Sequence, residues 1–366
     1  MANNADLNHA QQQKNDEFYT QYQDIEAEIN AYIEYNPDVF RNKTVLLPCD
    51  DPEWSNFTRY FVANFKSFGL KRLISTSYAK GAGNKHPTDF ETTSSAYDET
   101  KHATHGKLFV LDRDTLHTDP IGTDALSFTY LEGDGDFRSD EVKKLRNEAD
   151  IIVTNPPFSL FRAFVSWLYE ANKQFIIIGN SNAITYKEIF PLIQRNQLWL
   201  GASIHSGDRK FGVPDTYPLD AAGCGIDEKG QRYIRVKGVR WFTNIDHGVR
   251  HEKNIGMSTA DNLKFNKKLV KKLKEYGVNQ YPRYDDYDAI EIPFSNAIPT
   301  DYFGVMGVPI TFLDKFNPDE FTIIGLDRYT VPKQFLVGGR VAINGKPTYA
   351  RILIRRHNAS PSHENT

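Results

Sequence analysis

Residues 150–179, DIIVTNPPFSLFRAFVSWLYEANKQFIIIG, decide the fold of this chain. The segment opens with a short apolar run, continues after Asn155 and two prolines with apolar residues at helical spacing, and closes on the run QFIIIG. A strand, a helix and a second strand in this order form a right-handed crossover unit of a parallel sheet. Short continuous apolar strands are typical of sheets that helices cover on both faces.

The same order of elements stands nearer the N-terminus. An apolar run at 44–47 is followed by four phenylalanines at helical spacing between 57 and 68, and then by a second run at 72–76. Further helices are predicted at 24–36 and 186–195. The sequence therefore predicts an α/β fold with a doubly wound, mostly parallel sheet of the Rossmann-like kind.

After about residue 200 the alternation of strand and helix gives way to short β-like pieces, one of which is predicted over 233–241. One helix is predicted there, over 260–276, with Phe265, Leu269 and Leu273 inward and six lysines outward. We expect a disordered tail at 1–15 and a catalytic domain at 16–200. An α+β target-recognition region is expected at 201–366, and whether its last part packs back on the catalytic domain is left open.

Composition narrows the class of protein. The 366 residues contain no long apolar run, and the first stretch is polar where a signal peptide needs an apolar segment, so a cytoplasmic protein without a membrane partner is expected. Two cysteines exclude a disulfide framework and a four-cysteine zinc site. The net charge of -3 hides an asymmetry, because residues 1–180 carry 18 basic against 27 acidic side chains and residues 181–366 carry 26 against 20.

The tetrapeptide Asn155-Pro156-Pro157-Phe158 follows a predicted strand, where ligands of open parallel sheets bind. Such a site would suit the transfer of a methyl group to the amino nitrogen of adenine. This nitrogen is a poor nucleophile, and a catalyst must accept hydrogen bonds from its two protons. The Asn155 side chain and the Pro156 carbonyl can be those acceptors, because a Pro-Pro step fixes the carbonyl direction, and Phe158 offers a face for an extruded base. A turn that merely ends the strand, without a catalytic role, could have the same sequence.

Two more loops are expected at the same edge of the sheet. GDGDF at 133–137 offers a carboxylate and an aromatic ring that could contact a ligand, although a plain acidic turn fits the motif as well. No calcium site is expected, because the sequence lacks a bidentate Glu at the spacing that a calcium loop needs. Pro48-Cys49-Asp50-Asp51 should hold the methionine end of S-adenosylmethionine through Asp50 or Asp51. This segment lacks the usual Gly-x-Gly turn and is equally compatible with a capped helix start.

Contacts to DNA are assigned to the more basic second half. Phosphate contacts are predicted for Lys267, Lys268, Lys271 and Lys272, although a solvated helix face would show the same pattern. Base reading is placed in the stretch 201–251, with Arg209 and Lys210 as candidate DNA-binding residues. The predicted partner is double-stranded DNA, and no obligate protein partner is inferred.

Seven short motifs stand along the chain after its first 15 residues: DEFYTQ (16–21), CDDP (49–52), SNF (55–57), GDGDFRS (133–139), TNPPFSLFR (154–162), ITYKE (184–188) and VMGVPITFL (305–313). Together they resemble the EcoRI adenine-specific DNA methyltransferase family. The resemblance implies S-adenosylmethionine as methyl donor, a palindromic DNA target, and a place in a restriction-modification system or an orphan or phage-borne derivative.

Carried over by motif, the resemblance assigns roles to individual residues. Asn155, Pro156 and Phe158 would hold the target adenine, while the cofactor would be held by the following residues: Asp136 and Phe137 at its adenine, Asp50 and Asp51 at its methionine end, and Phe18, Tyr19 and Thr20 closing over it. The acid that normally binds the cofactor ribose is missing after the strand 72–76. Two alternatives stay open: an RNA or protein-glutamine methyltransferase using the same tetrapeptide, and a non-catalytic nucleic-acid-binding module.

Overall fold

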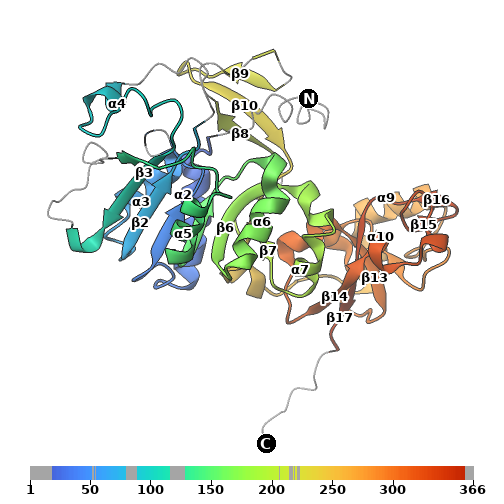
Figure 1. Ribbon diagram of the computed structural model, residues 1–366. Helices are drawn as coiled ribbons and strands as arrows, with labels where there is room; N and C mark the ends of the chain where they lie inside the picture. The colour runs from blue at the N-terminus through green and yellow to red at the C-terminus, as the bar shows by residue number, and fades with distance from the viewer. Residues whose placement is uncertain are drawn as a thin grey trace, which may run out of the picture. The chain divides into compact units, whose positions relative to one another are not determined.

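The structure is a computed structural model that describes residues 19–51, 53, 55–79, 89–115, 128–205, 207–213, 217, 219–220 and 223–358 (Figure 1). The contacts of the described residues divide the chain into two units. The first comprises the chain up to Ala183 together with Leu200–His247, and the second comprises Ile184–Trp199 together with the chain from Gly248 onward. Within the described ranges, no helix has the length and apolar character needed to cross a membrane.

The described part of the first unit is built on an eight-stranded sheet with the order β4-β3-β2-β1-β5-β6-β11-β7. Its strands are β1 (Thr44–Leu47), β2 (Arg72–Thr76), β3 (Lys107–Asp112), β4 (Phe128–Tyr130), β5 (Ile151–Thr154), β6 (Gln174–Asn180), β7 (Trp199–Leu200) and β11 (Val239–Thr243). The central strands β2, β1, β5 and β6 pair in parallel, and β3, β4 and β11 are attached by antiparallel pairing. The predicted α/β fold around a large sheet with a parallel centre is confirmed.

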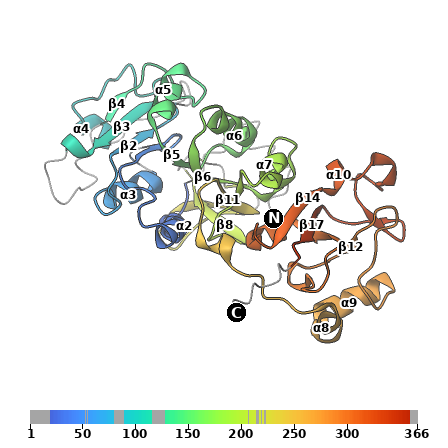
Figure 2. The ribbon, with the colours of Figure 1, turned by 90° about the horizontal axis from the view of Figure 1, so that it is seen from below.

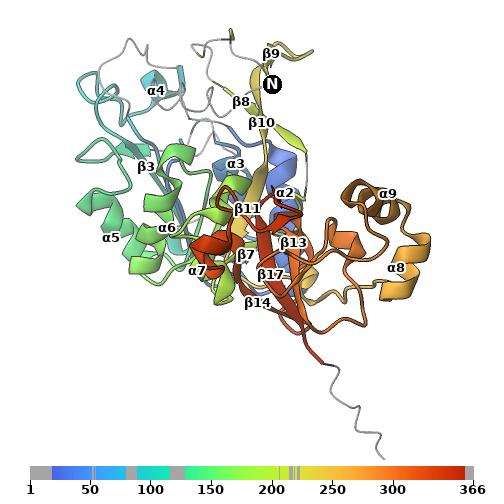
Figure 3. The same ribbon diagram turned by 90° about the vertical axis from the view of Figure 1, so that its right-hand side faces the viewer.

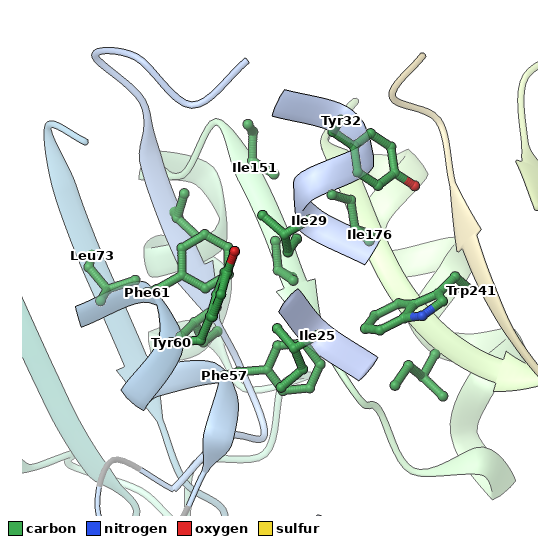
Figure 4. Close-up of a cluster of buried hydrophobic side chains, with 14 of the residues drawn as sticks. Ile25, Ile29, Tyr32, Phe57, Tyr60, Phe61, Leu73, Ile151, Ile176 and Trp241 are labelled. Carbon is green, nitrogen blue, oxygen red and sulfur yellow. The ribbon is translucent and has the colours of Figure 1, made fainter. Parts of the chain in front are cut away.

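Helices cover both faces of this sheet (Figure 2). α2 (Tyr22–Tyr35) and α3 (Asn56–Ala63) lie on one face, and α5 (Asp140–Glu148) and α6 (Phe161–Glu170) lie on the other. Strand side chains alternate between the faces, so Ile151 and Val153 join the cluster under α2 and α3 while Ile152 does not. Figure 4 shows this cluster, which includes Ile25, Ile29, Phe57, Phe61, Leu73, Ile151, Ile176 and Trp241.

A small antiparallel sheet with the order β8-β10-β9 completes the described part of the first unit. Its strands are β8 (Asp208–Gly212), β9 (Cys224–Ile226) and β10 (Arg232–Lys237). Phe211, Ile234 and Val236 are buried in the same apolar cluster as α2 and α3, which fixes this sheet to the larger one. The single β-like piece predicted over 233–241 is instead two strands, β10 and β11, because Gly238 turns the chain between them with a φ of 68°.

The second unit contains a four-stranded sheet with the order β12-β13-β17-β14 and a short hairpin of β15 and β16. Figure 3 shows β13, β17 and β14 of this sheet. Its strands are β12 (Ile290–Glu291), β13 (Val305–Pro309), β14 (Phe321–Leu326), β15 (Ala342–Ile343), β16 (Lys346–Pro347) and β17 (Arg351–Arg356). Its helices are α7 (Phe190–Gln194), α8 (Thr259–Phe265), α9 (Lys267–Tyr276) and α10 (Asp327–Thr330). The helix predicted over 186–195 is shorter because Pro191 occupies its first turn, where a missing N–H is tolerated.

The predicted helix over 260–276 is wrong in one respect, because it is two helices separated at Asn266. Asn266 leaves the helical region of the backbone, and its Oδ1 accepts a hydrogen bond from the Leu269 N–H at 3.1 Å, which caps α9. Leu269 and Leu273 are buried as predicted, but Phe265 precedes the break and is 59% exposed. The side chain of an asparagine can thus end one helix and begin the next where the apolar spacing alone continues.

Candidate active site

Two of the predicted motifs follow neighbouring strands of the large sheet. Val45 pairs with Ile151 and Leu46 with Ile152, so β1 and β5 lie side by side in parallel. β2 lies beyond β1 on one side and β6 beyond β5 on the other, and the strand order therefore reverses between β1 and β5. Ligands of open α/β sheets bind outside the carboxyl ends of the strands at such a reversal. The structure thus brings residues 48–51 and 155–158 to one place.

Hydrogen bonds tie the loop after β1 to its surroundings. Asp50 is only 6% exposed, and its carboxyl group lies 2.6 Å from Thr154 Oγ1 and 2.7 Å from Ser55 Oγ. Its backbone N–H donates to the Thr76 carbonyl at 2.8 Å, and Cys49 takes a left-handed conformation with a φ of 72°. Burial raises the pKa of Asp50 to about 7. This loop therefore holds a titratable group directly beside the strand that leads to Asn155.

The loop after β5 presents the predicted catalytic residues. Asn155 and Phe158 are half-buried, and Phe158 begins the short 3₁₀ turn η3 (Phe158–Leu160). The Pro157 carbonyl accepts a hydrogen bond from the Leu160 N–H at 2.9 Å, whereas no hydrogen bond to the Pro156 carbonyl occurs among the described residues. The Phe158 ring meets the ring of Phe211 from β8 edge-to-face, with centroids 6.4 Å apart. Sequence reasoning missed Phe211, because nothing in the sequence pairs β8 with this loop.

The GDGDF loop lies at the same edge, after β4. Its Asp134 carbonyl accepts a hydrogen bond from the Ala79 N–H at 2.7 Å, which joins it to the chain following β2. A Cβ at Gly135, whose φ is 82°, would stand 2.1 Å from the Ser77 carbonyl oxygen, so two backbones meet where no side chain fits. Gly135 therefore has a packing role that the sequence of the motif alone did not reveal.

The two predicted cofactor residues of this loop lie in different surroundings. The Asp136 side chain is 21% exposed and is bound by Arg138, whose guanidinium holds the pKa of the Asp136 carboxyl below its usual range. Phe137 is 4% exposed, and its ring packs on Phe164 and Trp167 of α6 at centroid distances of 5.0 and 5.6 Å. The structure places Asp136 at the surface of the loop and Phe137 in the core beneath it.

A buried lysine, Lys107, stands beside these loops and was not predicted. Its ammonium group lies 3.0 Å from Glu91, 3.4 Å from Glu53 and 3.5 Å from Asp51. Burial alone would lower the pKa of Lys107, but the three carboxylates raise it above its usual range. Lys107 begins β3, and a single lysine at the start of a strand gives no sequence signal. Its charge compensates the acids around Asp51 and orders the residues after β1.

The predicted N-terminal cofactor residues fall partly within the described chain. Phe18 lies outside it, whereas Tyr19 pairs with Gly212 of β8 through two backbone hydrogen bonds of 2.8 and 2.9 Å. The Thr20 carbonyl accepts a hydrogen bond from Asn56 Nδ2 at 2.7 Å. The hydroxyl groups of Thr20 and of Thr76, which ends β2, are buried and have no hydrogen-bond partner among the described residues.

Nearly the whole chain is similar to known proteins. The profile of a family described as "Adenine-specific methyltransferase EcoRI" matches residues 6–357. This chain belongs to that family. The Type II methyltransferase M.EcoRI of Escherichia coli is 41% identical over 356 residues, which cover 97% of each chain. M.MpnI of Mycoplasma pneumoniae and M.MgeORF184P of Mycoplasma genitalium are 34% and 32% identical over 362 residues, which cover 96% of this chain and 98% of theirs. No solved structure matches this chain. The prediction of an adenine-specific methyltransferase is confirmed.

In this adenine-specific methyltransferase, the small sheet carries a basic and aromatic outer face. Lys210 and Arg235 lie opposite each other on β8 and β10 and are exposed. Both approach the ring of Tyr233, Lys210 Nζ at 4.6 Å and the Arg235 guanidinium at 5.9 Å from its centroid. Arg209 points to the other side of β8 and lies 3.7 Å from Asp24. Both predicted DNA-binding residues of this stretch lie on β8, and Lys210 is the one on its exposed face.

The predicted lysines of the methyltransferase's second unit lie on α9. Lys267, Lys268 and Lys271 are exposed, whereas Lys272 is half-buried and forms an ion pair of 2.8 Å with Glu275. The hydrogen bond from Lys272 lowers the pKa of the Glu275 carboxyl. α9 thus presents several positive charges on one side while Leu269 and Leu273 face the interior.

Proposed function

We propose that this methyltransferase transfers a methyl group from S-adenosylmethionine to the exocyclic nitrogen of an adenine that has turned out of double-stranded DNA. The observation that supports it most is the loop 155–158 at the reversal of strand order, with the Pro156 carbonyl outside every hydrogen bond of the described residues. Its relatives are named Type II methyltransferases, and we place the enzyme in a restriction-modification system or in an orphan or phage-borne derivative.

The target base is proposed to lie against the loop after β5. The Asn155 side-chain oxygen and the Pro156 carbonyl accept hydrogen bonds from the adenine amino group, which favours the tetrahedral nitrogen needed for attack. Pro157 has no N–H that could compete for these acceptors. Phe158 stacks on the base, and its edge-to-face contact with Phe211 restrains the ring that does so.

The chain offers groups that fit the cofactor on the other side of the reversal. S-adenosylmethionine supplies an electrophilic methyl group when it is bound. Asp51 is proposed to attract its amino group. The buried hydroxyls of Thr20 and Thr76, which have no hydrogen-bond partner within the described part of the chain, fit a ligand rich in hydroxyl and carboxylate groups. Asp136 is proposed to accept a hydrogen bond at the cofactor adenine, with Phe137 anchoring its loop on α6. Phe18 and Tyr19 are proposed to close this side.

Duplex DNA is proposed to contact basic side chains of both units. Lys210, with Arg235 and Tyr233 beside it, offers a cationic and aromatic face on the small sheet, whose opposite face carries Phe211 toward Phe158. The exposed lysines of α9 are proposed to bind phosphates, which position the duplex without reading its sequence. The small sheet thereby links the DNA surface to the proposed position of the flipped base.

A substrate comparison tests the proposal. Labelled methyl transfer from S-adenosylmethionine is measured with unmethylated duplex DNA, single-stranded RNA and a glutamine-bearing protein, followed by digestion of the labelled product. We expect the label in N6-methyladenine of duplex DNA alone. Label confined to RNA or protein would replace the proposed substrate, and cofactor binding without transfer to any of the three would favour a binding module.

Replacing Asn155 tests the catalytic assignment. Asn155→Ala is expected to lower kcat by about 100-fold or more, because it removes an acceptor that acts mainly in the transition state, while the Kd for S-adenosylmethionine changes little. Asn147→Ala on the exposed side of α5 is the matched control and should keep its activity. Near-normal kcat for Asn155→Ala would remove this residue from the mechanism.

A further inference from the structure

Asp50 has a set of partners unlike that of an ordinary buried carboxylate. Its Oδ1 lies 2.7 Å from Ser55 Oγ, and its Oδ2 lies 2.6 Å from Thr154 Oγ1. Its backbone is held as well, because the Asp50 carbonyl accepts a hydrogen bond from Ser75 Oγ at 2.6 Å. No ion pair to Asp50 occurs among the described residues, and the nearby Lys107 reaches Asp51 instead. Burying a carboxylate without a positive partner costs far more free energy than burying a neutral carboxylic acid that is hydrogen-bonded.

The protons of these hydroxyl groups can be counted. Thr154 Oγ1 has a single proton, and it lies within hydrogen-bond distance of both the Pro48 carbonyl and Asp50 Oδ2. Ser55 Oγ accepts from the Phe57 N–H, so its own proton goes to Asp50 Oδ1. The carbonyl of Pro48 has no proton to give. Both contacts of Thr154 are satisfied only when Asp50 Oδ2 carries a proton and donates it to Thr154, which then donates to Pro48.

We infer that Asp50 is held as a neutral carboxylic acid, and that its chain of hydrogen bonds through Thr154 to Pro48 positions the neighbouring Asn155. Asp50 is then a positioning residue and not a ligand of the cofactor's amino group, the role that its sequence had suggested. The inference rests on the proposed function only where it concerns Asn155. The chain of hydrogen bonds crosses the strand reversal and fixes the loop after β5 to the loop after β1.

The surroundings of Asp50 favour the neutral form. β2 contributes Ser75 and Thr76, β5 contributes Thr154, and the start of α3 contributes Ser55, none of which is charged. The charged neighbour is Asp51 on the same loop, whose negative charge disfavours a second one and is bound by Lys107 of β3. Burial, the largest cause, raises the pKa of Asp50 to about 7, and Asp51 acts in the same direction.

Isosteric replacement separates the two roles of Asp50. In Asp50→Asn the amide N–H₂ can donate to Thr154 while the amide oxygen accepts from Ser55, so the neutral arrangement is preserved without a titratable group. We expect Asp50→Asn to keep kcat and the Kd for S-adenosylmethionine within about threefold of the native values. Asp50→Ala leaves Thr154 without its donor and should lower kcat by about tenfold or more. A carboxylate that bound the cofactor's amino group would give the opposite result, a Kd raised by about tenfold or more in Asp50→Asn.

Two further measurements keep the inference testable when catalysis fails. The infrared C=O band of a protonated carboxylic acid should be present in the free native protein at pH 6 and missing in Asp50→Asn, whatever the substrate proves to be. Thr154→Ser keeps a hydroxyl and should retain kcat, whereas Thr154→Val should lose it. Absence of the infrared band, or a raised cofactor Kd in Asp50→Asn, overturns the inference. Absence of methyl transfer to DNA by the native protein refutes only the proposed function.

Discussion

The two units of the chain each bury a carboxyl group in a different way. Asp50, in the first unit, is surrounded by hydroxyl groups and carries no ion pair among the described residues. Glu291 on β12 of the second unit is fully buried and receives three hydrogen bonds from the Arg351 guanidinium, at 2.5, 2.9 and 3.0 Å, and one from the Tyr284 hydroxyl at 2.5 Å. Burial would lower the pKa of Arg351, yet its bonds to Glu291 raise it.

The difference shows that the partner, more than the burial, decides the state of a buried acid. A guanidinium donates hydrogen bonds and carries a positive charge, so Glu291 and Arg351 form an ion pair within the sheet that contains β12 and β17. Hydroxyl groups bring no positive charge, so the hydroxyls around Asp50 leave the cost of burying its charged form unbalanced, and burial favours the neutral acid. The first arrangement suits a fixed structural link, and the second adds no charge of its own beside the proposed cofactor site.

Breaking the ion pair should have the largest effect on stability. Arg351→Met leaves Glu291 buried with only Tyr284 as donor, and we expect the free energy of unfolding to fall by about 3–5 kcal/mol. Urea denaturation of the full chain measures this loss. The double variant Arg351→Met with Glu291→Leu removes both charges and should recover much of it, because two apolar side chains can replace a buried pair. A loss below about 1 kcal/mol in the single variant would contradict the comparison.

The neutral acid should instead give a pH-dependent stability. The folded pKa of Asp50 is about 7, and an unfolded aspartate titrates near 4. Between these values the folded chain retains a proton that the unfolded chain has lost, so this contribution is present in full below about pH 4 and is lost as the pH rises to about 7. The loss amounts to about 4 kcal/mol over three pH units. The difference in unfolding free energy between native protein and Asp50→Asn should fall across this window, and a constant difference would show that Asp50 is already ionised.

A smaller effect is expected at the proposed base-binding ring. Phe158→Ala should weaken binding of duplex DNA by about 1–3 kcal/mol, because the stacking surface for the flipped base is lost. A mismatch opposite the target adenine lowers the cost of flipping and should restore part of the affinity. Phe335→Ala, at a position 40% exposed in the second unit, is the control. Equal losses for matched and mismatched DNA would place Phe158 outside the base site.

The smallest effect should come from the surface of the second unit. Lys267 and Lys271 of α9 are exposed, and neutralising both as Lys267→Gln and Lys271→Gln should weaken cognate and random DNA alike by about tenfold. The slope of log affinity against log salt should become less steep by about 0.9 for each lost phosphate contact. Lys144→Gln on α5 serves as the control. Selective loss of cognate binding would make α9 a reader of sequence.

Much of the first unit could be predicted because its signals are local. The apolar run before Asn155 and the helical spacing after Leu160 gave β5 and α6, and the position of the tetrapeptide after a strand gave its place at the edge of the sheet. The second unit was harder, because its strands pair over long sequence separations, as β12 does with β13 and β13 with β17. The break at Asn266 was missed because a capping side chain overrode a continuous apolar period.

The sequence by itself determined the family, the parallel centre of the sheet and the loops that follow its strands, since these depend on short motifs and on apolar periodicity. Only the tertiary structure decided which side chains meet. Phe211 contacts Phe158, and Lys107 forms ion pairs with three acidic side chains. Asp50 and Thr154, which form a hydrogen bond, are 104 positions apart in the sequence. The pKa of a carboxyl depends on burial and on the groups around it, and these are set by the packing of strands that no local pattern brings together.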